Sequence, residues 1–394
     1  MDFIYTEEQQ MLADAVGRWL EKTYDLQSRR AFAASPTLSE PNWAALAEMG
    51  VLGINIPQEW GGLGGTAVES LIVMQAFGRA LLVEPFAQTA VIAARLLSQA
   101  GSAAQKEVIL PEIAAGARRL GLATLEPRAR FDLAHIETTA KRRGNTYVLE
   151  GHKAVVPNGD SAHTLIVSAR TAGGVTDSGG VTLFLVDASA SGVTIRGFPT
   201  IDGLRAAEVT LTGVEVSSDS ILGLPDAGFE LLEFGVDQGI AALCAEGVGA
   251  MERLLELTLE HLRTRHQFGK PIGTFQALQH RVADMATAIE QARSVALLAA
   301  SRADHPERVE RRRGMSAAKA MVGRAGRLVG QQAVQLHGGM GMTDELAVGH
   351  YFKRLTCIDV TWGNVEHHVE LYGDLLCASA PTTDENHYAD SAFR

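Results

Sequence analysis

Residues 265–272 read RHQFGKPI and fill the break between two long stretches of helical periodicity, residues 227–264 and 275–302. An arginine at a helix end, followed by Phe-Gly and then Pro, can present its guanidinium to a phosphate group where the backbone turns. A solvated helix terminus would use the same residues, so this motif alone does not decide between the two interpretations.

A second motif, QLHGGMG, occupies residues 335–341 and follows the helical stretch 308–337. Closely spaced glycines let a ligand approach the backbone amides, and the side-chain amide of Gln335 can pair with a polar group. A helix C-cap followed by a turn would also use glycine here. The motif is not a dinucleotide-binding fingerprint, because no strand precedes it and its glycine spacing differs.

Outward from these motifs, the chain divides into three predicted domains and a tail. Residues 1–117 are predicted to be helical: Thr6 to Gln9 has the spacing of a capping box, and further helices are expected over 42–49, 66–81, 86–100 and 103–116. Residues 227–380 have helical periodicity again, with a fourth stretch over 344–376, and they predict a four-helix bundle. Residues 381–394 form a polar tail.

Between the two helical domains, residues 118–226 contain short β-prone runs separated by Gly, Asn and Asp turns. These runs are Tyr147–Leu149, Leu165–Val167, Leu183–Val186, Val193–Ile195 and Val209–Leu211. They predict a small β-barrel or sandwich. The expected fold class is therefore α+β, with an N-terminal helical domain, a central β domain and a C-terminal four-helix bundle.

The composition of the 394 residues, 46% hydrophobic and 21% charged, is that of an ordinary globular protein. A formal charge of -11 disfavours nucleic acid or an anionic membrane surface as partners. We see no secretion signal, no apolar run long enough to span a bilayer, and no Cys-x-x-Cys pair among three cysteines, so we expect a cytoplasmic protein. No metal site is expected, since Glu366, His367 and His368 lack zinc-ligand spacing.

Both motifs, in this order and on this layout, closely resemble those of the acyl-CoA dehydrogenase family. Its bundle domain carries Arg-x-x-Phe-Gly-x-Pro-Ile and later Gln-x-x-Gly-Gly-x-Gly. The resemblance covers nearly the whole chain and includes residues 56–64 and 151–159. Within the family the chain is most similar to the small subunit of pimeloyl-CoA dehydrogenase-type heteromeric enzymes, on residues 160–170 and 350–355.

The resemblance implies an FAD-dependent oxidoreductase that desaturates an acyl-CoA thioester between its α and β carbons. A glutamate removes the α proton and the flavin takes the β hydride, so the cofactor supplies the hydride chemistry and the protein aims it. It also implies electron-transfer flavoprotein as a partner, and a place in fatty acid or steroid side-chain β-oxidation.

The glutamate base of the family is missing from both of its usual positions. The loop position holds Trp362, whose indole cannot accept the α proton, and the alternative helix position holds Gly239. Glu246 lies seven residues beyond Gly239, on roughly the same helix face, and is a candidate for a relocated base. A lone helical carboxylate is more often a hydrogen-bonded or interface residue.

The flavin-contacting segments are altered as well. The family sequence Thr-Glu-Pro-Gly-x-Gly-Ser-Asp becomes LEPRARFD at residues 125–132, which replaces two glycines with arginines, and Trp-x-Thr becomes Val155-Val156-Pro157. By contrast, the residues that in the family hold the ADP half of a neighbouring subunit's FAD are intact. They are Arg265, Phe268, Gly269, Gln335, Gly338, Gly339 and Gly341.

This asymmetry leads to the hypothesis of a non-catalytic or half-site subunit in a heterotetramer, whose partner is a second acyl-CoA dehydrogenase-like chain. Three alternatives stay open. In the first, the chain is a self-sufficient homotetrameric dehydrogenase with a relocated base. In the second it is a flavin-dependent monooxygenase of the same fold, and in the third it is a CoA-thioester-binding scaffold without enzymatic activity.

Overall fold

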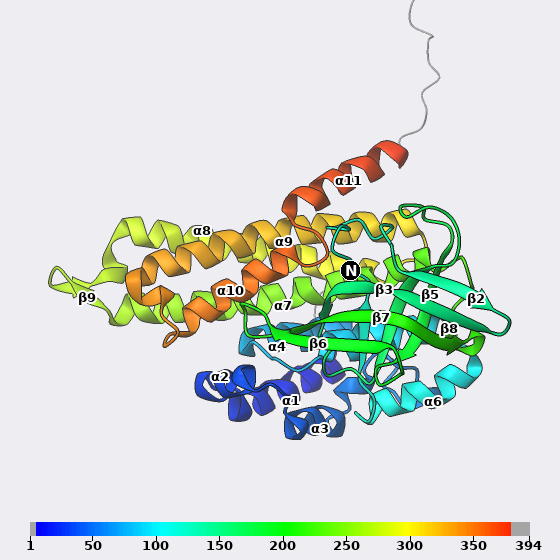
Figure 1. The fold of residues 1–394 in the computed structure, drawn as a ribbon. Helices are drawn as coiled ribbons and strands as arrows, with labels where there is room; N and C mark the ends of the chain where they lie inside the picture. The colour runs from blue at the N-terminus through cyan, green and yellow to red at the C-terminus, as the bar shows by residue number, and fades with distance from the viewer. Residues whose placement is uncertain (1–4, 380–394) are drawn as a thin grey trace, which may run out of the picture.

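The computed structural model describes residues 5–379, and within them a helical part, a sheet and a second helical part follow one another (Figure 1). The polar tail predicted over 381–394 lies outside the described residues. The N-terminal part contains α1 (Glu7–Thr23), α2 (Leu26–Ala34), α3 (Glu40–Glu48), η1 (Val51–Gly53), η2 (Gln58–Trp60), α4 (Ala67–Ala80), η3 (Ala87–Ala93), α5 (Ala94–Ala100) and α6 (Ala103–Ala114).

The first helix begins as the sequence predicts. The Thr6 hydroxyl accepts a hydrogen bond from the Gln9 amide, and the Gln9 side chain accepts one from the Thr6 amide, which completes the capping box. The stretch predicted as one helix over 86–100 differs, because its first half, η3, is a π-helix of seven residues. Such wide π turns are rare in proteins, and those that occur are often found at functional sites.

The central part is a sheet of eight strands in the order β6-β7-β3-β2-β4-β5-β8, with β1 paired in parallel with β4. The strands are β1 (Leu120–Ala123), β2 (Thr139–Arg143), β3 (Thr146–Pro157), β4 (Thr164–Arg170), β5 (Val181–Asp187), β6 (Val193–Pro199), β7 (Arg205–Ser217) and, after η4 (Ser218–Ser220), β8 (Ile221–Leu222). Side chains from β1 to β5 and from β7 pack in one apolar cluster. The sheet therefore curls over a core of its own, as a barrel or sandwich does.

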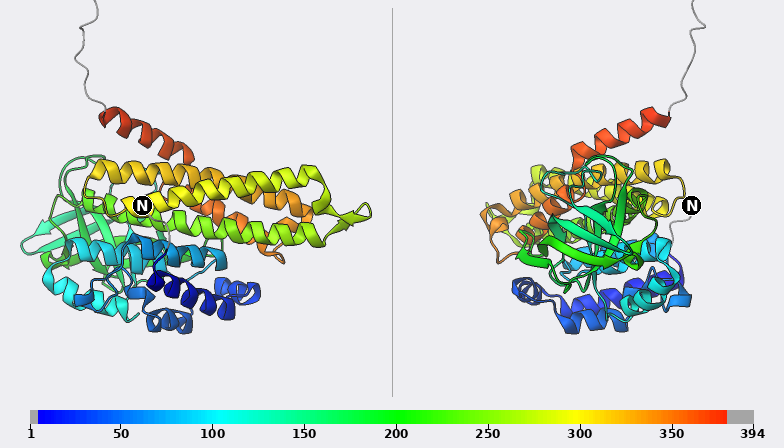
Figure 2. Two further views of the ribbon diagram at one scale, coloured as in Figure 1. Left: turned by 180° about the vertical axis from the view of Figure 1, so that it is seen from behind. Right: turned by 45° about the vertical axis from the view of Figure 1, so that its right-hand side comes forward.

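The C-terminal part is built on three long helices, α7 (Phe229–Thr264), α8 (Gln276–Arg302) and α9 (Arg308–His337). The strands β9 (His266–Gln267) and β10 (Lys270–Pro271) with η5 (Ile272–Thr274) join α7 to α8, and η6 (Gly338–Met342) follows α9. The last two helices are α10 (Ala347–Val360) and α11 (Val365–Ser379). In Figures 1 and 2 the β9 hairpin lies at the end of the bundle farthest from the sheet, and α11 projects from the body.

The single helix predicted over 344–376 was wrong. The chain breaks after Val360 because Trp362 and Gly363 both adopt positive φ angles, 54° and 111°, which no α-helix contains. Helices α7 to α10 form the four-helix bundle. The break separates α11 from α10 and places Trp362 at the inner end of the bundle.

The two helical parts share one apolar core, in which α4 packs against α7. The backbones touch at two glycines. A Cβ added at Gly78 would lie 2.0 Å from the carbonyl oxygen of Glu246, and one at Gly249 would lie 1.9 Å from that of Gln75. The middle of α7 is thereby held against the N-terminal part at a distance that only glycine permits.

Candidate functional site

A cleft of about 250 Å³ opens where the N-terminal helices, the sheet and the bundle meet. Its walls come from α4 and η3 on one side, from β3 and the β6–β7 loop on another, and from α7, α10 and the turn after α10 on the third. Most of the lining side chains are apolar, including Met74, Phe77, Phe86, Leu243 and Val360. Mostly apolar walls with a few polar groups are typical of a ligand site.

The structure brings together, beside this cleft, the two positions that the resemblance predicts for the family base, Gly239 and Trp362. The indole of Trp362 lies on Gly239 of α7, and a Cβ added at Gly239 would come within 2.5 Å of the ring and 2.9 Å of Ile92. The indole therefore fills the space that a side chain at position 239 would need. Neither position offers a carboxylate, so the spot where a base would stand is apolar and filled.

A buried lysine holds the turn that carries Trp362. Lys319 of α9 donates hydrogen bonds to the carbonyl oxygens of Asp359 and Gly363, at 2.7 and 2.6 Å. Burial lowers the pKa of this ammonium group to about 8. The Trp362 carbonyl oxygen also pairs with Nε2 of His368, at 3.0 Å. These bonds tie both sides of the turn to the bundle and keep the indole in the cleft.

His368 makes the stability of this turn dependent on pH. Burial, together with the nearby charge of Lys319, lowers the pKa of His368 from 6.5 to about 3. The unfolded chain therefore binds a proton between pH 6.5 and pH 3 that the folded chain does not. Stability should fall as the pH drops through this window, at about 1.4 kcal/mol per pH unit from this one group.

We expect the His368→Gln variant to lose less stability than the wild type between pH 7.5 and pH 5.0, by about 2 kcal/mol. Glutamine keeps a donor for Trp362 and does not titrate in this range. Urea denaturation at the two pH values measures the difference. Equal losses in the two proteins would contradict the assignment, because the remaining loss would then come from other groups.

Glu246 lies at the cleft but is bound on both oxygens. Arg354 of α10 donates from Nε and Nη2 to its two carboxylate oxygens, both at 2.6 Å, and from Nη1 to Asp202 at 2.8 Å. All three side chains are buried. Burial alone lowers the pKa of Arg354, but Glu246 and Asp202 outweigh it and hold it above the ordinary value. This pairing weighs against Glu246 as a base, since both oxygens are engaged by a permanent cation.

The loop over residues 125–132, which the resemblance aligns with the flavin-contacting loop of the family, carries bulkier side chains than the family sequence. Its start is anchored by a buried ion pair, Glu126 to Lys153 at 2.7 Å, and its end packs Phe131 against His367 of α11, with ring centroids 5.3 Å apart. Arg130 between them has a positive φ of 47°. Phe131 thus contacts the start of α11 where the family sequence has serine, while Arg128 and Arg130, which replace the glycines, are exposed.

The residues of the two motifs, 265–272 and 335–341, lie at the other end of the molecule, on the bundle tip (Figure 1). Phe268 and Gly269 form the turn of the β9–β10 hairpin with φ angles of 55° and 79°, and the Phe268 side chain is 89% exposed. Arg265, Gln335, Gly338 and Gly339 are exposed beside it. Gly341 is buried. His337 stacks on His261, with ring centroids 4.3 Å apart, and joins the ends of α9 and α7.

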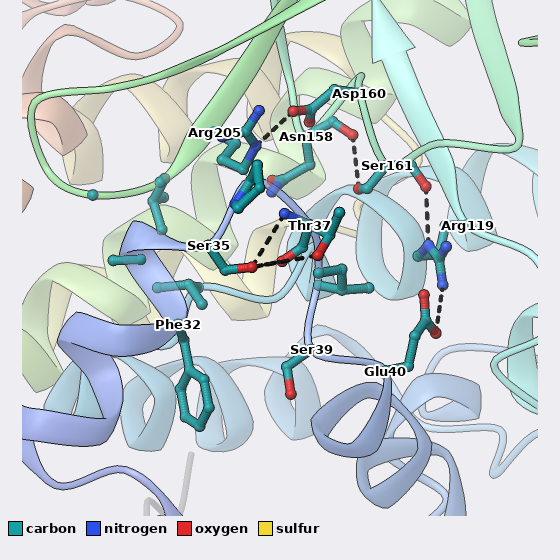
Figure 3. A pocket seen from close by; sticks show the side chains of 16 residues that line it. Phe32, Ser35, Thr37, Ser39, Glu40, Arg119, Asn158, Asp160, Ser161 and Arg205 are labelled. Atoms are coloured by element: carbon teal, nitrogen blue, oxygen red, sulfur yellow. Dashed lines mark hydrogen bonds and ion pairs between the residues drawn. The ribbon is translucent and has the colours of Figure 1, made fainter.

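A second cavity, of about 200 Å³, adjoins the cleft and shares Asn158, Leu204 and Arg205 with it (Figure 3). It is polar. Arg205 pairs with Asp160 at 2.6 Å, and in the same view Arg119 bridges the Ser161 carbonyl oxygen and Glu40. Both of these arginines are already bound to carboxylates.

Sequence reasoning missed three residues that shape the cleft: Arg354, Lys319 and Gln88. Each is a polar side chain inside a helical stretch, and such residues usually face solvent. Only their position on the buried face of a helix distinguishes Arg354 and Lys319 from arginines and lysines at the surface. A helical wheel would have revealed that position. Gln88 carried no such signal, because its orientation depends on the π-helical turn.

Within the described residues, no helix is both long and apolar enough to cross a membrane.

The sequence matches three family descriptions in order: "Acyl-CoA dehydrogenase, N-terminal domain" over residues 6–117, "middle domain" over 121–214 and "C-terminal domain" over 226–375. It is 30% identical over 373 residues to "Probable acyl-CoA dehydrogenase YngJ" of Bacillus subtilis, covering 93% of this chain and 97% of that protein.

Two solved structures with the same fold carry two chain names each, and one of them is described as a complex. The Tcur3481-Tcur3483 steroid ACAD variant has a TM-score of 0.85 and 31% identity, covering 94% of this chain and 98% of that one. The ChsE4-ChsE5 complex from Mycobacterium tuberculosis has a TM-score of 0.86 and 26% identity, covering 97% and 100%. With all three family domains matched over most of its length, this chain belongs to the acyl-CoA dehydrogenase family of oxidoreductases.

Proposed function

We propose that this chain is the half-site subunit of a heteromeric FAD-dependent acyl-CoA dehydrogenase. It contributes the grip on the FAD pyrophosphate and adenosine, and a second acyl-CoA dehydrogenase-like chain contributes the ring pocket and the base. The reaction is the α,β-desaturation of an acyl-CoA thioester, with electron-transfer flavoprotein as the electron acceptor. The cytoplasm is the proposed location.

The observation that carries this proposal is the separation of the intact motifs from the altered cleft. Gly239 and Arg265 lie on one continuous helix and its end, so the helix rise of 1.5 Å per residue separates them by roughly 40 Å. Arg265 cannot reach a ligand in the cleft of its own chain. An exposed arginine and an exposed phenylalanine at a bundle tip fit a ligand that another subunit presents.

The residues of the cleft do not fit a flavin ring of its own. In the family the ring is met by backbone amides and hydroxyls, whereas here Pro157 of the cleft has no amide hydrogen. Outside the cleft, Phe131 of the 125–132 loop packs on His367. The bundle tip does fit the other half of the cofactor. Arg265 can pair with a diphosphate through charge-assisted hydrogen bonds, and Gln335 can donate its amide hydrogens.

FAD, where the partner holds it, supplies the hydride acceptor. The residues of this chain then bind and orient. Arg265 would neutralise charge on the FAD phosphates, and the exposed glycines at 338 and 339 would let the cofactor approach the backbone. Phe268 would cover an apolar face of the bound cofactor. The partner's ring stays outside this chain's cleft, where Trp362 stands in place of a base.

The proposal is tested by coexpressing the chain with the acyl-CoA dehydrogenase-like protein encoded beside it. We expect two FAD per α2β2 tetramer. The Arg265→Ala variant should lose FAD and activity, with an FAD affinity weaker by about 10- to 100-fold for the loss of a charge-assisted contact. Arg263→Ala, two residues earlier on the exposed end of α7, is the matched control and should retain both.

One FAD per chain in the purified complex, or full activity of the isolated chain, would refute the half-site assignment. Activity of the isolated chain that disappears in Glu246→Gln would instead favour the self-sufficient homotetramer. Oxygen consumption with reduced flavin would favour the monooxygenase. Stabilisation by acyl-CoA without turnover in any complex would favour a binding scaffold.

A further inference from the structure

Among the described residues that line the cleft, one buried side-chain atom has no hydrogen-bond partner. Gln88 is 5% exposed, lines the cleft, and its Oε1 is buried without a hydrogen bond to any described residue. A buried amide oxygen without a partner is costly, and native proteins contain few of them. The unpaired group therefore calls for an explanation from something that the cleft binds.

The neighbouring polar groups are satisfied within the protein. Glu84 accepts from Asn42 and Tyr24, and Thr89, next to Gln88, donates to the Leu120 carbonyl oxygen. Gln88 lies near the start of the π-helix η3. A π turn that carries an unpaired buried amide oxygen at the wall of a cavity is typical of a functional position.

The rest of the cleft decides which ligand group would meet Gln88. A carboxylate is disfavoured, because both arginines that line the cleft within the described residues are already paired, Arg354 with Glu246 and Asp202 and Arg205 with Asp160. A wholly apolar group would leave the amide unpaired. A hydroxyl both donates and accepts, so it pairs with the terminal amide in either orientation.

We propose that this cleft binds a compact acyl group that carries a hydroxyl, and that Gln88 recognises the hydroxyl. The cavity of about 250 Å³ has room for a short or partly inserted acyl group, smaller than a drug-sized ligand. This deepens the proposed function, on which it rests for the acyl-CoA class. Since Trp362 fills the base position, this chain binds the hydroxyacyl group and does not dehydrogenate it.

The test compares calorimetric binding of 3-hydroxybutyryl-CoA, 4-hydroxybutyryl-CoA and butyryl-CoA to the heteromeric complex, with wild-type or Gln88→Leu chain. The partner's own sites are the same in both complexes, so any difference belongs to this chain. We expect the wild type to bind one of the hydroxyacyl thioesters roughly 10-fold more tightly than butyryl-CoA at one site per chain. The variant should show no such preference at that site.

A second readout separates recognition from a structural role. Gln88→Leu should raise the Tm of the ligand-free complex, because it removes an unpaired buried oxygen. Gln105 is the matched control, since its amide donates to the Asp219 and Ile221 carbonyl oxygens and accepts from Ser102, and Gln105→Leu should lower the Tm.

A lower Tm in Gln88→Leu, or binding of the three thioesters that is unchanged by the substitution, would overturn this inference. Neither result touches the FAD count, which tests the half-site proposal separately. Two FAD per tetramer with no hydroxyl preference would therefore refute the inference alone. A hydroxyl preference with one FAD per chain would refute the half-site proposal alone.

Discussion

The Arg354→Met variant should lose about 3 to 5 kcal/mol of unfolding free energy, because it leaves two buried carboxylates, Glu246 and Asp202, without their cation. The three charges join α7, the β6–β7 loop and α10 across the cleft, and all three side chains are at most 9% exposed. Urea denaturation at pH 7.5 measures the loss. Arg196→Met is the control, since the Arg196 side chain is 73% exposed and its pair with half-buried Glu208 lies at the surface of the sheet, so its loss should barely move the midpoint.

A double-mutant cycle then separates the ion pair from the packing of the arginine side chain. Adding Glu246→Gln to Arg354→Met removes one of the two stranded charges and should restore part of the lost stability, although Glu246→Gln alone should be destabilising. If the stability losses of Arg354→Met and Glu246→Gln simply add in the double variant, the two side chains are not energetically coupled. The description of Glu246 as one member of a buried ion network would then fail, and its candidacy as a base would regain weight.

Gly249→Ala should be at least as damaging, with a loss of about 3 kcal/mol or more, at the upper end of what overpacking costs. The added methyl group would stand 1.9 Å from the Gln75 carbonyl oxygen, and a backbone atom in a helix cannot turn away as a side chain does. Helices α4 and α7 would have to move apart, which opens the shared core and shifts Glu246 and Leu243 at the cleft.

The same substitution at Gly17 is the matched control. Gly17 lies in α1 with nothing within 4 Å of an added Cβ, so alanine there should stabilise the protein by about 0.5 to 1 kcal/mol through helix propensity. Thermal and urea unfolding of the two variants should therefore move in opposite directions. Parallel shifts would show that the close contact between α4 and α7 is not what Gly249 provides.

Much of the fold follows from local pattern. The capping box at Thr6, the helical periods of α7, α8 and α9, and the β-prone runs that became β3 to β7 all depend on neighbours in sequence. Shorter elements escaped this reasoning: α2, β1, β2 and β8 are short or polar, and their pairing with distant segments decides their structure. The break after Val360 was missed because a positive φ at Trp362 depends on Lys319 and His368, which are remote in sequence.

The sequence alone determined that the two motifs proposed to bind FAD are present and that neither predicted position of the family base holds a carboxylate, because the identity of a residue at a motif position requires no coordinates. The tertiary structure decided how these residues relate in space. It laid Trp362 on Gly239, bound Glu246 to Arg354, and left the Gln88 Oε1 without a partner among the described residues. It also set Arg265 at the C-terminal end of α7, next to β9 and far along the helix from Gly239. Burial, pairing and separation arise from contacts between segments far apart in the chain, which local sequence pattern does not encode.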